Sequence, residues 1–350
     1  MSDSSAFHDP SFFTKKPFGQ LSDGTKIDLF TLQNTQGMEL SITNFGAAIQ
    51  SCVVPLVHGK KRDVVLGYGS AADYEQSYLS GASPYLGAIV GRVAGRLQHG
   101  KLIHDGKHIQ LEKNHGDHHL HGGQGGFSSA VFALLSFENS ENPSLTLQHT
   151  SRSVDCGYPG DVTLEVKYTL LESNAISIEM TATSTEDTVL NLTQHNYFNL
   201  SGHAESLEGH KLKMDSTRII DVDKELIPTG HFTSLNKHAF DFTEFKPCPI
   251  KIDTSFILDH RRNTTAELTS TDSNLSLKVQ TNQPIMHIYI GGQTVIRGKE
   301  NISYHSRSGI CFEAQAYPDA PNQPSFPSIA LKKGQEYRNE TIFEFQHEQY

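Results

Sequence analysis

The first residues of this chain that could do chemistry lie in the stretch 191–202. It reads NLTQHNYFNLSG and places His195 between Gln194 and Asn196, close to Tyr197. An imidazole can gain or lose a proton near neutral pH, and amide and aromatic side chains beside it can orient a polar ligand. Alternating apolar residues precede the stretch, so we expect a strand that enters the floor of a polar pocket. A lone histidine on a strand is more often a hydrogen-bonded core residue, so a role in chemistry needs support from elsewhere in the chain.

A second candidate is the histidine-rich stretch 114–127, which reads NHGDHHLHGGQGGF. Zinc sites use three or four ligands in a closed geometry, often with cysteine or carboxylate among them. The spacing of His119 and His121 suits ligands on a strand, but no glutamate follows closely, and His118 would point to the opposite face. We therefore expect no metal here. The stretch is either a solvated turn, or the double glycine after His121 bends the backbone so that one imidazole projects into a cleft.

Two carboxylates are further candidates. Glu313 lies in the alternating segment CFEAQ, where it shares a strand face with Cys311 and Gln315. A charged carboxylate on an inward face is costly unless it is paired or functional, and the pattern leaves inward and outward placements equally open. Asp253 precedes an apolar run in KIDTSFIL and by itself is typical of a turn aspartate. Histidines, carboxylates and amides together suit proton transfer on a polyhydroxylated ligand.

Composition narrows the classes of function. The chain has 29 basic and 39 acidic residues and a net charge of −10, without a basic run, which argues against nucleic acid and anionic membranes as partners. The sequence contains no nucleophile elbow, P-loop or Rossmann glycine motif. Its four cysteines stand singly, which fits a reducing compartment. No apolar run approaches the roughly 18 residues of a membrane span, and the start lacks the apolar region of a signal peptide. We expect a cytoplasmic protein.

The elements that must position these side chains are predicted to be strands. Apolar residues alternate with polar ones in several segments, at 38–42, 162–170, 176–180 and 275–279. The main helical candidate is 71–79. Many short strands without alternating helices predict an all-β protein with antiparallel sheets in a sandwich or a barrel. We find no internal repeat or linker, so we expect one domain over 1–350, with 1–20 as a partly ordered lead-in.

Taken together, the motifs resemble the aldose 1-epimerase (galactose mutarotase) family over nearly the whole chain. They occur in the family's order: ITNFGAAIQS, DVVLGY, GRVAGR, LHGGQGGF, DCGYPGDV, NLTQHNYFNLSG, LIPTG and the block 313–328. Each motif is weak alone, and their order and spacing carry the resemblance. It implies a large antiparallel β-sandwich, the supersandwich, with an open carbohydrate cleft for a hexose and no cofactor.

The resemblance also assigns residues to roles. Glu313 falls at the family's general base, His195 at its acid, and His121 at a second histidine beside the ring oxygen. The sugar-binding positions fall on Arg96, Asp253 and Gln283.

Three positions depart from the family pattern. Gly95 and Gly292 stand where asparagine is usual, and His118 stands where asparagine is frequent. The change at Gly95 removes one amide contact to the sugar and leaves the preferred sugar open, while the proton-transfer pair is intact.

The expected activity is the interconversion of the α and β anomers of free aldohexoses such as D-glucose and D-galactose. One group must take the proton of the anomeric hydroxyl while another protonates the ring oxygen, which suits a glutamate of ordinary pKa about 4.3 and a histidine of about 6.5. We expect these groups on opposite sides of one pyranose. Two alternatives stay open: a hexose-phosphate 1-epimerase, which would need more arginines at the cleft rim, and a non-catalytic carbohydrate-binding protein. We expect a monomer or a homodimer.

Overall fold

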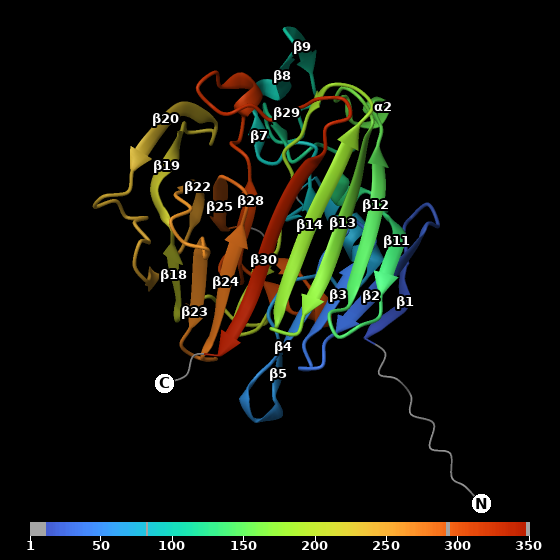
Figure 1. The fold of residues 1–350 in the computed structure, drawn as a ribbon, viewed down its shortest axis with the longest axis vertical. Coiled ribbons are helices and arrows are strands. Elements are labelled where there is room, and N and C mark those ends of the chain that lie inside the picture. The colour runs from blue at the N-terminus through green and yellow to red at the C-terminus, as the bar shows by residue number, and fades with distance from the viewer. Residues whose placement is uncertain (1–11, 82, 292–294, 348–350) are drawn as a thin grey trace, which may run out of the picture.

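Three of the four alternating segments, 162–170, 176–180 and 275–279, lie in a nine-stranded antiparallel sheet, the front layer of Figure 1. The fourth, 38–42, lies mostly in the N-terminal sheet described below. This computed structural model describes residues 12–81, 83–291 and 295–347. The nine-stranded sheet comprises, in spatial order, β11 (Ala133–Glu138), β12 (Ser144–Ser151), β13 (Val162–Leu171), β14 (Ala175–Ser184), β30 (Tyr337–His347), β24 (Leu275–Thr281), β23 (Ala266–Ser270), β18 (His210–Met214) and β21 (Lys246–Pro247). In β13 every second side chain is buried, as period-two alternation predicts for a sheet with one face on the core.

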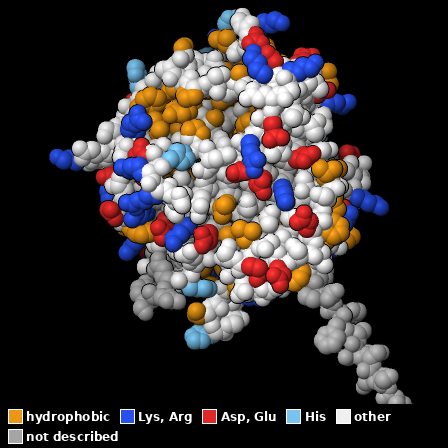
Figure 2. Space-filling model, viewed as in Figure 1, with side chains coloured by type: hydrophobic (Ala, Val, Ile, Leu, Met, Phe, Trp, Pro, Cys, Tyr) orange, Lys and Arg blue, Asp and Glu red, His pale blue; other side chains and the backbone are white. Residues whose placement is uncertain are grey.

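The outer face of this sheet is polar. Figure 2 shows basic and acidic side chains interspersed over it, with hydrophobic side chains gathered at the upper left, around β19 and β20. Cross-strand ion pairs contribute to this face, for example Arg338 of β30 with Glu179 of β14, whose Nη2 and Oε2 atoms lie 3.5 Å apart. Such exposed pairs add little to stability, so the sheet depends on its inner face.

A six-stranded antiparallel sheet forms a second layer. Its order is β17 (Tyr197–Phe198), β28 (Ile310–Gln315), β25 (Ile285–Ile290), β22 (Ile252–Leu258), β19 (Ser216–Val222) and β20 (Pro228–Ser234). The rings of Phe198 and Phe343, from β17 and β30, have centroids 4.8 Å apart and join the two sheets. All six residues of β28 are buried, because one face of the strand lies on this core and the other faces a pocket.

A five-stranded sheet adds the N-terminal strands, in the order β1 (Phe13–Gln20), β2 (Lys26–Gln33), β3 (Glu39–Thr43), β4 (Ile49–Pro55) and β5 (Lys61–Asp63). Within the expected partly ordered lead-in over 1–20, Phe13–Gln20 form an ordered strand that pairs with β2. Phe13 stacks on Phe137 of β11, with ring centroids 4.1 Å apart, and Lys15 pairs with Asp28. Because β1 is a mostly exposed edge strand, its sequence lacks the alternation that marks the others. Residues 1–11 of that prediction lie outside the described residues.

The remaining elements are short. Helix α1 covers Ala71–Leu79, as predicted, and Ser70 caps it by accepting a hydrogen bond from the Asp73 amide. The others are α2 (Ser153–Cys156), the 3₁₀ turns η1 (Val57–Gly59), η2 (Gln98–Gly100), η3 (Phe127–Ser129), η4 (Lys299–Asn301) and η5 (Ala320–Asn322), and five strand pairs: β6 (Ile89–Val90) with β16 (Thr193–Gln194), β7 (Arg96–Leu97) with β10 (His119–Leu120), β8 (Lys101–His104) with β9 (Lys107–Gln110), β15 (Thr188–Val189) with β29 (Ala330–Leu331), and β26 (Ile296–Arg297) with β27 (Ser303–Tyr304).

One hydrophobic core is shared by the three large sheets. It includes Phe30 of β2, Leu147 of β12 and Phe256 of β22, all buried. The antiparallel all-β architecture that the sequence predicts is confirmed. The shared core supports our proposal of a single domain. Among the described residues, no helix has the length and apolar character needed to cross a bilayer.

Candidate active site

A pocket of about 720 Å³ lies against the six-stranded sheet, on the face opposite the shared core. Its floor is made of side chains that alternate along neighbouring strands. His287 of β25 is the register partner of both Ser255 in β22 and Glu313 in β28, so these three form one row. The next row holds Asp253, Tyr289 and Cys311. Because residues two apart share a strand face, both rows point the same way.

Glu313 faces inward. It lines the pocket, and its exposed fraction is only 2%. This decides between the two placements that the sequence left open. A carboxylate so buried is stable only with polar partners, and His195 supplies one: its Nε2 atom lies 3.4 Å from Glu313 Oε1.

His195 lies where the chain passes from one sheet to another. The strand predicted over this stretch is interrupted there: β16, just before His195, pairs with β6, and β17, just after Asn196, pairs with β28. The His195 amide donates to the Ala88 carbonyl, and its own carbonyl accepts from the Gly87 amide. On the far side of the ring, Nδ1 lies 3.6 Å from Cys311 Sγ. These contacts leave Nε2 directed at Glu313.

His121 enters the same pocket from the β7–β10 pair. Its backbone has φ 54°, the left-handed conformation, so the predicted sharp bend occurs at the histidine itself as well as at the glycines. The Gly95 amide donates to His121 Nδ1 over 3.3 Å, which places the ring hydrogen of a neutral imidazole on Nε2. Burial, and then the neighbouring His195 and Arg96, lower the pKa of His121 well below the ordinary value. His121 is therefore a neutral hydrogen-bond donor.

Asp253 is a strand residue of β22, so its interpretation as a turn aspartate was wrong. Its Oδ1 lies 3.0 Å from His287 Nε2, and its Oδ2 lies 3.7 Å from Arg96 Nη2. Burial alone would raise the pKa of Asp253, but the hydrogen bond from His287 and the charges of His287 and Arg96 outweigh it and lower the pKa to about 2. The carboxylate thus stays ionised and can accept hydrogen bonds from hydroxyl groups.

Of the predicted site residues, the structure brings Arg96, His121, His195, Asp253 and Glu313 to one pocket. Gln283 is different. It lies between β24 and β25, is not among the residues that line the pocket, and its amide nitrogen donates to Asn282 Oδ1 and the Arg338 carbonyl. We correct that assignment, because the Gln283 amide is bonded to residues outside the pocket lining.

His287 is a pocket residue that sequence reasoning missed. The segment MHIYI alternates, so His287 and Tyr289 share a face of β25, and both line the pocket. That alternation was the available signal. What it could not indicate is that β25 lies between the strands of Asp253 and Glu313.

The other histidines of the rich stretch have internal partners. His119 Nδ1 contacts the Glu112 carbonyl and its Nε2 contacts the Tyr158 hydroxyl, so it is a buried structural residue. His118 Nδ1 accepts from the His99 amide. His115, by contrast, lines the pocket.

One group of side chains among the described residues could hold a metal ion: ligand atoms of His121, His195 and Glu313 lie within 4.8 Å of one another. A metal needs a free lone pair on each imidazole. The Gly95 hydrogen bond occupies that of His121 Nδ1 and leaves a hydrogen on Nε2. The donor set therefore suits hydrogen bonding to a ligand better than coordination of an ion.

One departure from the family pattern, Gly95, lines the pocket. Gly95 has φ 78°, and a Cβ built there would lie 3.1 Å from Pro318 Cβ, so a side chain needs some displacement of its neighbour. Gly292 lies outside the described residues.

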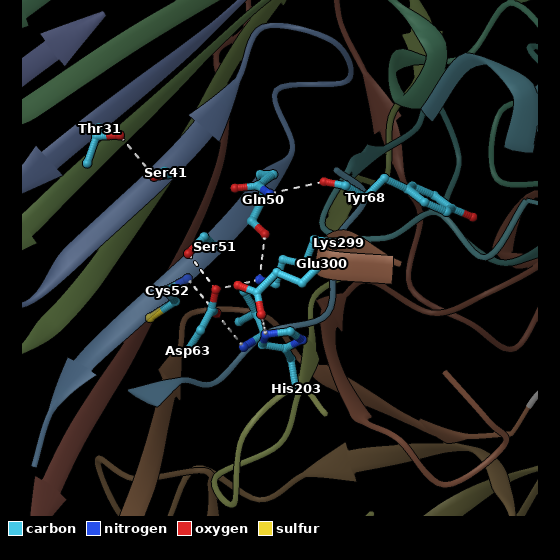
Figure 3. A network of polar contacts seen from close by, with 12 residues as sticks. Thr31, Ser41, Gln50, Ser51, Cys52, Asp63, Tyr68, His203, Lys299 and Glu300 are labelled. Atoms are coloured by element: carbon cyan, nitrogen blue, oxygen red, sulfur yellow. Dashed lines mark hydrogen bonds and ion pairs between the residues drawn. The ribbon is translucent and has the colours of Figure 1, made fainter. Parts of the chain in front are cut away.

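A buried ion pair supports one wall of the pocket. Lys299 Nζ lies 2.6 Å from Asp63 Oδ2 and donates to the Gln50 carbonyl over 3.0 Å (Figure 3). Burial lowers the pKa of Lys299, an effect that the charge of Asp63 opposes. Lys299 lies between β26 and β27, whose residues Arg297 and Tyr304 line the pocket. The pair thus fastens this hairpin to β5.

Comparisons with known proteins agree over nearly the whole chain. A family model described as aldose 1-epimerase matches residues 28–344. A galactose mutarotase from Bos taurus is 33% identical over 350 residues, which cover 95% of this chain and 98% of that protein. An aldose 1-epimerase from Escherichia coli (strain K12) is 31% identical over 343 residues, which cover 92% of this chain and 96% of that protein. Among solved structures, an aldose epimerase homologue from C. elegans has a TM-score of 0.85 with 28% identity and covers 91% of this chain and 98% of its own. A galactose 1-epimerase from Lactobacillus acidophilus has a TM-score of 0.83 with 26% identity, and the match covers 97% of this chain and 100% of that chain.

Proposed function

The chain belongs to the aldose 1-epimerase family and is an aldose 1-epimerase, and we propose that its substrates are free aldohexoses such as D-glucose and D-galactose. The proposal extends to the roles of the pocket residues. Glu313 is the general base, His195 the general acid, and His121 a neutral donor to the ring oxygen. Arg96 and Asp253 orient the sugar through hydrogen bonds to its hydroxyls.

In the proposed reaction, Glu313 removes the proton of the anomeric hydroxyl while His195 gives a proton to the ring oxygen. The bond between C1 and the ring oxygen breaks and leaves an open-chain aldehyde. Rotation about the C1–C2 bond then presents the other face of the carbonyl. When the ring closes, the hydroxyl that attacks C1 returns its proton to His195, and Glu313 returns its proton to the new anomeric oxygen. The enzyme ends in its starting protonation state.

The observation that carries this proposal is the contact between His195 Nε2 and Glu313 Oε1, at 3.4 Å, on the pocket floor. It differs from our expectation of two groups on opposite sides of a pyranose. The anomeric hydroxyl and the ring oxygen are both bonded to C1, so two neighbouring side chains can each reach one of them. General acid and base groups must lie within hydrogen-bond reach of the protons they transfer.

Polarimetry tests the proposal directly. Freshly dissolved α-D-glucose or α-D-galactose should approach its equilibrium rotation faster with the protein, in proportion to its concentration. The same assay with glucose 6-phosphate, followed by NMR of the anomeric proton, separates a free-sugar enzyme from a phosphate-specific one. No acceleration with either free hexose would contradict the substrate assignment, and acceleration with the phosphate alone would replace it.

The four cysteines are free thiols, three of them buried. This supports a reducing compartment, and we propose the cytoplasm. Size-exclusion chromatography with light scattering would distinguish a monomer from a homodimer.

A further inference from the structure

The side chain of His287 is held at both ring nitrogens. Nε2 lies 3.0 Å from Asp253 Oδ1, and Nδ1 lies 2.8 Å from the Ser255 hydroxyl. Both partners belong to β22, the strand next to β25, and the exposed fraction of the His287 side chain is 17%. Because both nitrogens are engaged, the ring has a fixed orientation. A bound sugar could hydrogen-bond to this ring only by displacing Asp253 or Ser255 from it.

On the opposite side, His287 faces the strand of the proposed base. Its register partner in β28 is Glu313, and side chains of directly opposed residues in an antiparallel pair have Cβ atoms about 4.5–5.5 Å apart. The imidazole thus lies between two carboxylates, hydrogen-bonded to Asp253 and next to Glu313. Neither the anomeric hydroxyl nor the ring oxygen needs it as a proton donor in the proposed reaction.

We infer that His287 is a positioning residue that stays protonated between Asp253 and Glu313, fixing the sugar-binding carboxylate and keeping the base ionised. This inference rests on the proposed function of the same pocket. It assigns His287 a charge rather than a contact with the reacting atoms.

The charges around His287 come from four elements. Asp253 on β22 and Glu313 on β28 favour the imidazolium, whereas Arg96 on β7 opposes it. His121, which follows β10, is a neutral donor and does not compete for the charge. Burial by itself would lower the pKa of His287, but the hydrogen bond to Asp253 and the two negative charges outweigh it and raise the pKa.

A cation at this position has a definite consequence for Glu313. An opposite charge within a few ångströms favours the ionised form of a carboxyl group, typically by about 1–3 pKa units. Removing the imidazolium should therefore take away this attraction, and activity should fall most in weakly acidic solution. The acidic limb of the kcat/KM profile reports the pKa of the base in the free enzyme.

The test compares three variants by polarimetry from pH 4 to pH 9. In His287→Gln, the amide can still bond to Asp253 and Ser255, but the charge is gone. We expect the acidic limb of the kcat/KM profile to move to higher pH by roughly one pH unit. The variant should keep part of its activity on the plateau of that profile. His287→Ala should show the same shift together with a higher KM, because Asp253 loses its fixed partner. His108→Gln, an exposed histidine of β9 outside the pocket lining, is the matched control and should leave the profile unchanged.

A profile lowered equally at every pH in His287→Gln, with its acidic limb in place, would overturn the inference and leave a purely structural role. If the unmodified protein fails to accelerate anomer exchange at all, the proposed function itself is wrong, and the two failures are thus distinguishable.

Long-range proton–nitrogen correlation spectra of the unmodified protein give a second readout that needs neither activity nor variants. The inference requires both His287 nitrogens to carry protons above the ordinary histidine pKa, and a neutral ring at pH 6 would contradict it.

Discussion

His195 and Glu313 are brought opposite each other by the register of two strands. Tyr197 of β17 pairs with Cys311 of β28 in an antiparallel arrangement. Continuing that register by two residues, past the end of β17, sets His195 across from Glu313, where the observed distance between Nε2 and Oε1 is 3.4 Å. A shift of one residue in this pairing would turn one of the two side chains to the other face of the sheet. The proposed acid and base therefore depend on a short, two-residue strand.

The first prediction concerns the base. Replacing Glu313 by glutamine preserves the shape of the side chain but removes its ability to accept a proton. We expect the polarimetric rate to fall by about 10²–10⁴-fold, the usual contribution of a positioned general base. Calorimetric binding of galactose should be retained, because Arg96 and Asp253 are unchanged. An unchanged rate in this variant would exclude the proposed role.

The second prediction concerns the hydrogen on His121. The Gly95 amide holds Nδ1 as an acceptor, so His121 should act only as an Nε2 donor, in its neutral form. Since burial keeps its pKa well below the ordinary value, ionisation of His121 should not appear in the pH–rate profile near the ordinary histidine pKa. Replacement by phenylalanine removes the donor and should reduce kcat by about 10²-fold. Replacement by glutamine retains a donor and should recover part of that loss; equal losses in both variants would argue against hydrogen bonding by this residue.

The third prediction is a dependence of stability on pH. Because the pKa of Asp253 is lowered to about 2, its interactions stabilise the folded state above its ordinary pKa near 4, and this contribution is lost as the pH falls toward 2. A shift of about two units corresponds to roughly 2–3 kcal/mol. The pKa of its partner His287 is raised, so the stabilisation from the same ion pair is complete below pH 6.5 and is lost as the pH rises through the folded-state pKa. The pair should therefore stabilise the fold most between about pH 4 and pH 6.5.

Urea unfolding at pH 3, 5.5 and 9 measures this effect. In Asp253→Asn, the free energy of unfolding should fall most at pH 5.5 and less at pH 3 and pH 9. Asp117→Asn is the control: its carboxylate is 74% exposed and pairs only with Lys113 on the surface. A loss of equal size at all three pH values would mean that Asp253 contributes through packing rather than charge.

The sequence was sufficient to predict the elements whose pattern is local. Strand β13 and helix α1 lie at the segments that the sequence predicted, since each buries one face against the core and the other remains in contact with water. The exposed strand β1 carries no such pattern and was missed.

The site shows the same division between local and non-local information. Glu313 was recognised as a candidate, but its inward orientation depends on which strands flank β28, and this is decided by pairing between residues far apart in the chain. Gln283 was assigned to the pocket from its resemblance alone, whereas His287 occupies the pocket because β25 is the neighbour of both β22 and β28. Alternation shows which residues share a face of a strand. The order of strands in the sheet determines which other side chains that face contacts.

The last prediction concerns the buried ion pair behind the pocket wall. In Lys299→Met, the partly buried Asp63 carboxylate loses its charged partner, although Ser51 and the Cys52 amide still donate to it (Figure 3). Breaking one side of a buried pair costs about 3–5 kcal/mol, so urea unfolding should show a large loss of stability. The double variant with Asp63→Asn should recover part of it, because no uncompensated charge remains. Lys332→Met is the control: Lys332 pairs with Asp187 but is 59% exposed, so its replacement should lower the free energy of unfolding far less.

The Lys299→Met variant should also show whether this ion pair affects sugar binding or the chemical step. Lys299 fastens the β26–β27 hairpin, which lines the pocket, but it does not itself line it. When this hairpin is loosened, sugar contacts should weaken while His195 and Glu313 keep their places on the floor. We therefore expect KM for galactose to rise several-fold in Lys299→Met, with kcat within a factor of about two or three of the unmodified enzyme. A fall in kcat at unchanged KM would mean that the ion pair supports the floor of the pocket rather than its wall.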